Sequence, residues 1–366
     1  MRYKMRTFSK RDTNILKGIA IVLLLFHHIF YDTWASGIPS PQIFLLPSVT
    51  SILTRYGACS IFIFALLSGY GIEASMEKDM SMSRVTVRRE TVLLGTFVPV
   101  YFAGLIAVMI GAHSITAPLI NAYGENKLQI LINMILDMFG LSNLAGLNML
   151  NPTWWYMGAA HLIIFCTPLA VILFFALDKY RASGGLLIFL WLYAAFHNEG
   201  FIYIFQYCMV AAVTGAYLRK ERVIEKISRC FASVKGRILE AVLIVLSILV
   251  YHAAYQYGGL NTYFITAVFA PVSMVVVYDY VSKIRYLRTV LEVLGENSAI
   301  MYMSHTFFLD IEPLRAFSYQ FKYAFMTYLF ILIADLGFSV GLKKLMDVSG
   351  YNKLLSRIQR LEPSAS

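Results

Sequence analysis

Charged residues are scarce in this chain. Asp, Glu, Lys and Arg make up 14% of its 366 residues, whereas hydrophobic residues make up 58%. A water-soluble domain has about 25% charged and about 45–50% apolar residues. The mean hydropathy of +0.65 points the same way. The composition therefore argues against a soluble globular protein, and we expect an all-α polytopic membrane protein.

Cysteine is rare as well, and its four residues show neither metal-ligand spacing nor a disulfide framework. They are Cys59, Cys166, Cys208 and Cys230, and we expect them to pack as small apolar side chains. The first apolar run lacks a small-residue cleavage site, so we expect a membrane span there rather than a cleavable signal peptide. We find no soluble second domain, and no internal repeat of the kind that builds inverted-repeat transporters.

Long apolar runs recur along the whole sequence, and several reach the roughly 20 residues that a helix needs to cross a bilayer. The runs are Ile15–Phe30, Thr91–Gly111, Leu162–Leu177, Ile238–Tyr251, Thr262–Tyr278 and Tyr323–Leu342.

Positive charge is abundant, with a formal net charge of +10, but it falls into short clusters between the apolar runs. Only four of the 31 basic residues lie outside these clusters and Lys17, namely Arg55, Lys127, Arg315 and Lys322. Basic residues concentrate on the cytoplasmic side of membrane proteins. The charge thus indicates topology, and nucleic acid is not an expected partner.

If the basic clusters lie on the cytoplasmic side and successive spans cross the membrane in alternating directions, the chain has ten spans with both termini in the cytoplasm. The spans are near 15–33, 50–73, 91–112, 154–177, 184–197, 200–218, 238–255, 261–280, 290–310 and 321–342. The segment 127–147 then has both ends outside, and we expect an interfacial or re-entrant helix there. Residues 1–346 are predicted to form one integral-membrane domain of the plasma membrane, and 347–366 a short cytoplasmic tail.

The first span carries ionisable residues, which are costly in a membrane and suggest function. Lys17 and His28 are 11 residues apart, which is 20° past three full turns and about 16 Å along the helix axis. They therefore share one face, whereas His27 is rotated away by 100°. Asp32 lies four residues after His28, within reach of its ring.

Structural roles compete with functional ones at each of these positions. Lys17 also fits a side chain that extends to the inner headgroups, and His28 a hydrogen-bonded interface residue. His27 fits packing. All seven histidines map to the outer half or the outside, where most are expected to face water. His28 and His305 stand out, because each lies in a long span beside other polar groups. We assign no role to Asp335 from the sequence.

Five segments resemble the membrane acyltransferase-3 family, the bacterial O-acyltransferases of surface polysaccharides and peptidoglycan. They are the first span with its basic residue and His eleven positions later, IFIFALLSGYGI (61–72), RVTVRRE (84–90), NPTWWYM (151–157) and ENSAIMYMSHTFF (296–308). The family usually has Arg where this chain has Lys17, and Lys lacks the bidentate fork of Arg.

The resemblance implies acyl transfer from cytoplasmic acyl-CoA, most simply acetyl-CoA as co-substrate with no metal, to a hydroxyl of a cell-surface or lipid-linked polysaccharide. Cations at the inner face would hold the CoA phosphates: Lys17, Arg84, Arg88 and Arg89. The hypothesis makes His28 the general base, oriented by Asp32, with a transient acyl-histidine as the alternative. Ser68 and Gly69 fit either a close approach of backbone to the donor or a tight helix contact.

On the outer side, Arg55, Trp154 and Trp155 again have both functional and structural interpretations. Arg55 fits stabilisation of the oxyanion, binding of the acceptor, or anchoring to headgroups. Trp154 and Trp155 fit stacking on a sugar or a belt of interfacial aromatic residues. His305 is expected to face His28 across the site.

Two other functions remain open from the residues alone. Buried Lys, His and Asp also suit a transporter or flippase for a glycolipid or polar solute, and a structural subunit of a polysaccharide assembly complex is a third reading. The 16 Å between Lys17 and His28 favours a long thioester arm over a proton relay, which needs groups in hydrogen-bond contact. The acyl group, the acceptor and the oligomeric state, including a homo-oligomer, are left open.

Overall fold

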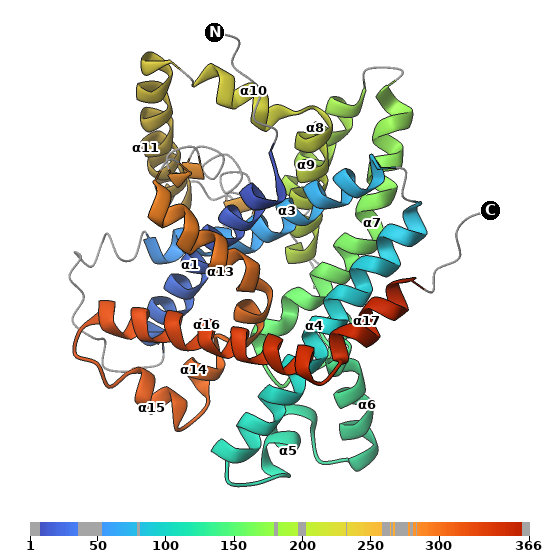
Figure 1. Ribbon diagram of the computed structural model, residues 1–366, viewed down its shortest axis with the longest axis vertical. Helices are drawn as coiled ribbons and strands as arrows, with labels where there is room; N and C mark the ends of the chain where they lie inside the picture. Colours follow the sequence, from blue (N-terminus) through green and yellow to red (C-terminus); the bar gives the residue numbers. More distant parts are fainter. Residues whose placement is uncertain are drawn as a thin grey trace. The chain divides into compact units, whose positions relative to one another are not determined.

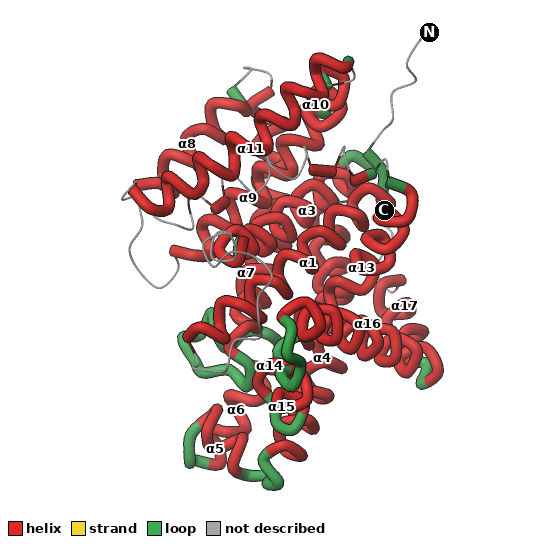
Figure 2. The backbone as a smooth tube through the Cα atoms, turned by 90° about the vertical axis from the view of Figure 1, so that its left-hand side faces the viewer, coloured by secondary structure: helices red, strands yellow, loops and turns green. Residues whose placement is uncertain are grey.

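The computed structural model describes most of the chain, and its regular structure in the described residues is helical, without strands (Figure 2). The described residues are 8–35, 53–78, 81–178, 182–196, 203–231, 233–257, 264, 266–267, 277–278, 281–282 and 284–360. The predicted all-α fold class is therefore correct for this part of the chain.

The helices follow one another along the chain as labelled in Figure 1. They are α1 (Lys10–Ala35), α3 (Cys59–Met76), α4 (Met82–Gly111), α5 (Ala117–Tyr123), α6 (Lys127–Met138), the 3₁₀ turn η1 (Pro152–Trp154), α7 (Trp155–Asp178), α8 (Ser183–Phe196), α9 (Tyr203–Lys220), α10 (Val223–Cys230), α11 (Val234–Tyr257), α13 (Arg285–Ser304), α14 (Phe307–Asp310), α15 (Leu314–Ser318), α16 (Ala324–Val348) and α17 (Tyr351–Arg360).

Five helical segments in the described residues are long and apolar enough to cross a membrane. They are Lys10–Tyr31, Leu53–Met76, Met82–Gly111, Pro152–Asp178 and Ala324–Val348. Each coincides with a predicted span. Four more predicted spans overlap the helices α8, α9, α11 and α13, which are not among these five segments. The predicted span 261–280 lies largely outside the described residues.

The segment expected not to cross contains the short helix α6. Its 12 residues measure about 18 Å, well below the roughly 30 Å of a bilayer core. Asn126 begins the helix, because its side chain accepts hydrogen bonds from the backbone N–H groups of Leu128 and Gln129. The remainder of 127–147 is turn and loop rather than helix.

The first helix begins at a reciprocal cap. The backbone N–H and the hydroxyl of Ser9 both donate to Asp12 Oδ2, at 2.8 and 2.7 Å. The backbone N–H of Asp12 donates in return to Ser9 Oγ at 3.4 Å. This is the arrangement of a capping box, which satisfies donors that the helix itself leaves unpaired. The cap fixes the residue at which α1 starts. It therefore also fixes how far Lys17 and His28 lie from the start of the helix.

Internal contacts divide the chain into two units. Unit 1 comprises Met1–Leu24, Arg55–Val85 and Leu162–Glu296, and unit 2 comprises Leu25–Thr54, Thr86–His161 and Asn297–Ser366. The helices α1, α4, α7 and α13 each contribute residues to both units.

In unit 1, glycines bring α1 and α13 into backbone contact. A Cβ atom at Gly18 would lie 2.0 Å from the carbonyl oxygen of Leu291, and one at Gly295 would lie 1.7 Å from that of Asn14. Neither site has room for any other residue. Small residues allow close approach of membrane helices, where packing rather than the hydrophobic effect drives association.

The helices α3 and α9 use the same device in unit 1. A Cβ atom at Gly69 would lie 1.8 Å from the carbonyl oxygen of Ala212, and one at Gly215 would lie 1.9 Å from that of Leu66. The cysteines Cys59 and Cys208 are buried in these two helices as free thiols. They pack as apolar residues, as expected.

In unit 2, α4 contacts the helices α14 and α17. Its Gly104 lies against the ring of Phe307 in α14, and its Gly95 against the side chain of Leu355 in α17. The ring of Phe307 in turn lies 5.8 Å from that of Phe338 in α16. These contacts hold the chain around residues 304–311 between α4 and α16, which is where the candidate site lies.

Candidate active site

Two histidines from distant parts of the sequence meet in unit 2. The ring centroids of His28 in α1 and His305, directly after α13, are 4.8 Å apart, with the ring planes inclined by 47°. His28 is half-buried and His305 is fully buried. The structure therefore brings together the two histidines that the sequence singled out.

The tautomer of His305 follows from its surroundings. Its Nδ1 lies 2.7 Å from the backbone oxygen of Tyr302. A carbonyl can only accept, so Nδ1 carries the proton. The other nitrogen, Nε2, is buried and has no hydrogen-bond partner among the described residues. A neutral ring avoids the cost of burying a charge, so Nε2 presents a lone pair.

His27, the neighbour of His28, faces a different environment. Its Nδ1 lies 2.7 Å from the backbone oxygen of Thr54, and its ring stacks on Tyr31 at 5.1 Å. These contacts agree with the packing role expected for a residue that does not share the helix face of Lys17 and His28. Asp32 belongs to α1, but its side chain lies outside the described residues.

A second polar contact lies directly beside His305. The hydroxyl of Ser304 is 2.8 Å from the backbone oxygen of Ile300 and 2.6 Å from Asp335 Oδ1. One hydroxyl proton cannot fully serve two acceptors, and a protonated Asp335 would supply the second. Asp335 is fully buried, and its Oδ2 has no partner among the described residues. The neutral form fits this environment best.

The cations expected to bind the donor do not all belong to one unit. Lys17 of α1 and Arg84 of α4 are half-buried residues of unit 1, whereas Arg88 and Arg89 of α4 belong to unit 2. The axial spacing of Lys17 and His28 does hold, because α1 is a single helix through both residues.

The pair Ser68 and Gly69 occupies a helix contact. The hydroxyl of Ser68 donates to the backbone oxygen of Phe64 one turn earlier, at 2.8 Å. Gly69 lies against the backbone of Ala212 in α9. Of the two roles considered for Gly69, the structure fits the tight helix contact.

Trp154 is a core residue of unit 2 rather than an interfacial one. It is 1% exposed, and its indole N–H donates to the backbone oxygen of Met303 at 2.8 Å. Its ring lies 5.1 Å from Phe97. Trp155 is half-buried and contacts Tyr156 edge to face. Trp154 thus ties the chain before α7 to the end of α13.

Arg55 belongs to unit 1, whereas the two histidines belong to unit 2. Its side chain is half-buried, and its backbone oxygen accepts a hydrogen bond from the hydroxyl of Tyr251 at 3.1 Å. That contact concerns the backbone alone and leaves all three roles considered for the guanidinium open.

One sequence signal for the histidine pair was missed. Each histidine follows a glycine by ten residues, Gly18 before His28 and Gly295 before His305. The glycines lie in the contact of α1 with α13. If both spans run outward, as the charge pattern predicts, equal spacing carries the two histidines to the same height.

Two buried clusters of unit 2 were also missed. The ring of His161 lies between Glu90 and the backbone oxygen of Phe139, with Nδ1 and Nε2 each 2.9 Å from an acceptor. Asp137 Oδ2 accepts from the hydroxyl of Tyr123 at 2.6 Å. Asp137 and His161 are both buried, so His161 is not among the histidines that face water.

Among the described residues, no group of three His, Cys, Asp or Glu side chains is placed to hold a metal ion. The comparisons leave the family open: no protein-family model, no curated protein and no solved structure matches this chain.

Proposed function

We propose that the protein is a membrane-bound O-acyltransferase. It would move an acyl group, most simply acetyl, from cytoplasmic acyl-CoA to a hydroxyl of an extracytoplasmic or lipid-linked polysaccharide. The observation that carries the proposal is the contact between His28 and His305. A half-buried imidazole, held against a second ring of fixed tautomer, has the surroundings of an oriented general base.

The donor would bind from the cytoplasmic side. In this proposal the chain crosses the plasma membrane ten times with both termini inside, and Lys17, Arg84, Arg88 and Arg89 meet the CoA phosphates. The pantetheine arm would then follow α1 over the roughly 16 Å from Lys17 to His28.

The proposed step is a direct transfer. His28 takes the proton of the acceptor hydroxyl as the hydroxyl oxygen attacks the thioester carbonyl carbon. The carbon–sulfur bond breaks, and the departing thiolate receives the proton from the imidazolium. The ring of His305, in contact with that of His28, is suited to limit the rotation of the His28 ring. Asp32 keeps its expected orienting role, and an acyl-histidine route would use the same ring.

Binding of the donor tests this proposal against its main competitor. Purified protein in nanodiscs is heated with and without acetyl-CoA, and the release of free CoA is followed in parallel. We expect acetyl-CoA to raise the melting temperature, since ligand at 100 times its Kd stabilises by about 2.7 kcal/mol, and we expect slow hydrolysis. Lys17→Gln should weaken both effects. Absence of both in the wild type would count against acyl transfer.

Transport is the second candidate, and one observation favours it. Ser304 joins Asp335 by a hydrogen bond directly beside His305, which contacts His28. A row of ionisable groups at close range suits proton-coupled transport. In that case acetyl-CoA should neither bind nor be hydrolysed, whereas Asp335→Asn should abolish proton-driven solute uptake in proteoliposomes.

A further inference from the structure

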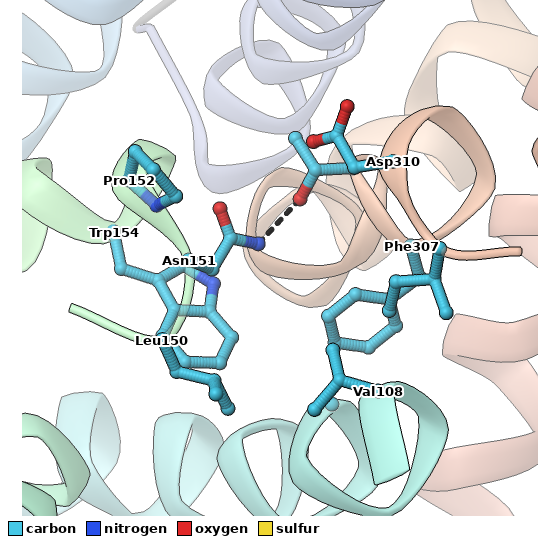
Figure 3. A pocket seen from close by; sticks show the side chains of 10 residues that line it. Val108, Leu150, Asn151, Pro152, Trp154, Phe307 and Asp310 are labelled. Carbon is cyan, nitrogen blue, oxygen red and sulfur yellow. Dashed lines mark hydrogen bonds between the residues drawn. The ribbon is translucent and has the colours of Figure 1, made fainter. Parts of the chain in front are cut away.

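Unit 2 contains a pocket of ≈ 230 Å³ (Figure 3). Its walls come from Gly104 and Val108 of α4, from the stretch Leu150–Trp154, and from the stretch Thr306–Ile311 that follows α13. Thr306 directly follows His305 in the chain, so their Cα atoms are about 3.8 Å apart. The wall of the pocket therefore includes the residue that directly follows His305 in the chain.

One side of the pocket is polar. Asn151 Oδ1 accepts from the backbone N–H and the hydroxyl of Thr153, at 3.0 and 2.8 Å. These two donors fix which way the amide points, so the Asn151 amide nitrogen donates to Thr306 Oγ1. Figure 3 places the Asp310 carboxylate above this amide. Asn151 and Thr306 are buried, and Asp310 is exposed at the rim.

The opposite side is apolar. Figure 3 shows the ring of Phe307 and the side chain of Val108 facing the polar groups from below. Trp154 lends carbon surface only, because its indole N–H is already bonded to Met303. Gly104 makes room for this wall, since a Cβ atom there would lie 2.8 Å from the Phe307 ring and 3.3 Å from that of Trp154.

This combination defines the chemistry of a ligand. A carboxylate can only accept hydrogen bonds, so a ligand that contacts it must donate, as the hydroxyl groups of a sugar do. Aromatic and aliphatic walls cover the carbon–hydrogen face of a ring. The volume is below the roughly 300–1,000 Å³ of pockets that hold drug-sized ligands, so one small ring fits. Asp310 lines the pocket, and no Lys or Arg is among the described residues that line it, so a second negative charge would be repelled.

We propose that this pocket binds one uncharged, hydroxyl-bearing sugar ring of the acceptor and discriminates against a ring that carries a carboxylate. The assignment rests on the proposed acyl transfer for its purpose, because it would hold the acceptor close to the chain segment of His305, the residue that contacts the proposed base His28. The recognition itself requires no acyl donor. Asp310 and Asn151 act as binding residues, and selection for neutral rings comes from the charge of Asp310.

The test measures binding without any donor. Full-length protein is reconstituted in nanodiscs, because alkyl glycoside detergents carry sugar themselves. Saturation-transfer NMR then compares methyl β-D-glucopyranoside with methyl β-D-glucuronide, which differs by a carboxylate. Val108→Trp fills the pocket. Ile106→Trp adds the same bulk on the outer face of the same helix, where Ile106 is 57% exposed. Asp310→Asn removes the charge and keeps the shape.

The wild type should bind the glucopyranoside in preference to the glucuronide. Val108→Trp should weaken that binding by at least tenfold, and Ile106→Trp should leave it within twofold. Asp310→Asn should weaken it by about tenfold, the usual effect of losing a hydrogen bond to a charged group, and should remove the preference. Equal binding by Val108→Trp and the wild type overturns the pocket, and a wild type without preference overturns the selection by charge.

Failure here can be separated from failure of the proposed function. If the wild type transfers acetyl groups but Val108→Trp binds the sugar normally, the pocket assignment is wrong and acyl transfer stands. If the glycoside binds as described but acetyl-CoA is never consumed, the sugar site stands and acyl transfer is wrong.

Discussion

His28 and His305 lie against each other, with ring centroids 4.8 Å apart, although 277 positions separate them in the sequence. The backbone oxygen of Tyr302 fixes the tautomer of His305. The neighbouring Ser304 binds Asp335. Residues of α13 and α16 thus form hydrogen bonds at or next to His305. The roles of the two rings can be tested separately.

The role of His305 is testable by replacing it with glutamine. His305→Gln removes the ring that contacts His28 and keeps a polar side chain. We expect the kcat of acyl transfer to fall at least tenfold, whereas the KM for acyl-CoA changes little, because His305 would position the base and not the donor. Steady-state kinetics in nanodiscs measure both constants. A rise in KM at constant kcat would show instead that His305 serves binding.

The glycine contact between α1 and α13 predicts a strong effect of a single methyl group. Gly18→Ala and Gly295→Ala would place a Cβ atom 2.0 and 1.7 Å from a carbonyl oxygen of the partner helix. We expect each to destabilise the protein by about 1–3 kcal/mol and to reduce activity. Gly337→Ala in α16 is the matched control, because nothing lies within 4 Å of its added Cβ. Thermal unfolding of the three variants compares them, and equal melting temperatures would refute the contact.

Asp137 predicts a pH-dependent stability. Burial raises the pKa of Asp137 to about 6, against the opposing hydrogen bonds from Leu150 and Tyr123. A raised pKa means that the folded state holds the proton more tightly. Its stabilising contribution is therefore full below about pH 4, the range of an unperturbed Asp, and is lost as the pH rises to about 6. Relative to Asp137→Asn, the wild type should lose about 3 kcal/mol over this interval. Parallel stability curves for the two proteins would contradict the shift.

The contact of His161 with Glu90 predicts a coupled loss of stability. Their 2.9 Å contact is mostly buried, with side-chain exposures of 7% and 14%. His161→Leu leaves a buried carboxylate without its partner and should cost about 3 kcal/mol or more. His161→Leu combined with Glu90→Leu should cost much less than the sum of the single changes. Urea or thermal unfolding of the four proteins gives the coupling energy. Additive losses would mean that the two side chains act independently.

Much of the fold could be predicted because its signals are local. Spans were predicted near 15–33, 50–73, 91–112, 154–177 and 321–342, and each coincides with a helical segment that is long and apolar enough to cross a membrane. The segment 127–147, predicted not to cross, contains the short helix α6. Helical periodicity also separated His28 from His27, which bonds to Thr54 instead.

The remainder depends on contacts between distant segments, which no local pattern encodes. Asp137 interrupts an apolar helix, and only the position of Tyr123 shows that this carboxylate is buried. Trp154 resembles an interfacial aromatic residue until Met303 accepts its indole N–H. The pocket at Asn151 and Asp310 could not be predicted from the sequence for the same reason, because its walls come from three separate parts of the chain.

The most direct test of the central claim is O-acetylation of surface polysaccharide in cells that express either the wild type or His28→Ala at equal levels. The account predicts that acetylation falls by about 100-fold or more in His28→Ala, the usual effect of losing a general base, and that His27→Ala stays close to the wild type. Unchanged acetylation in His28→Ala, or equal loss in both variants, would contradict the claim that His28 is the base.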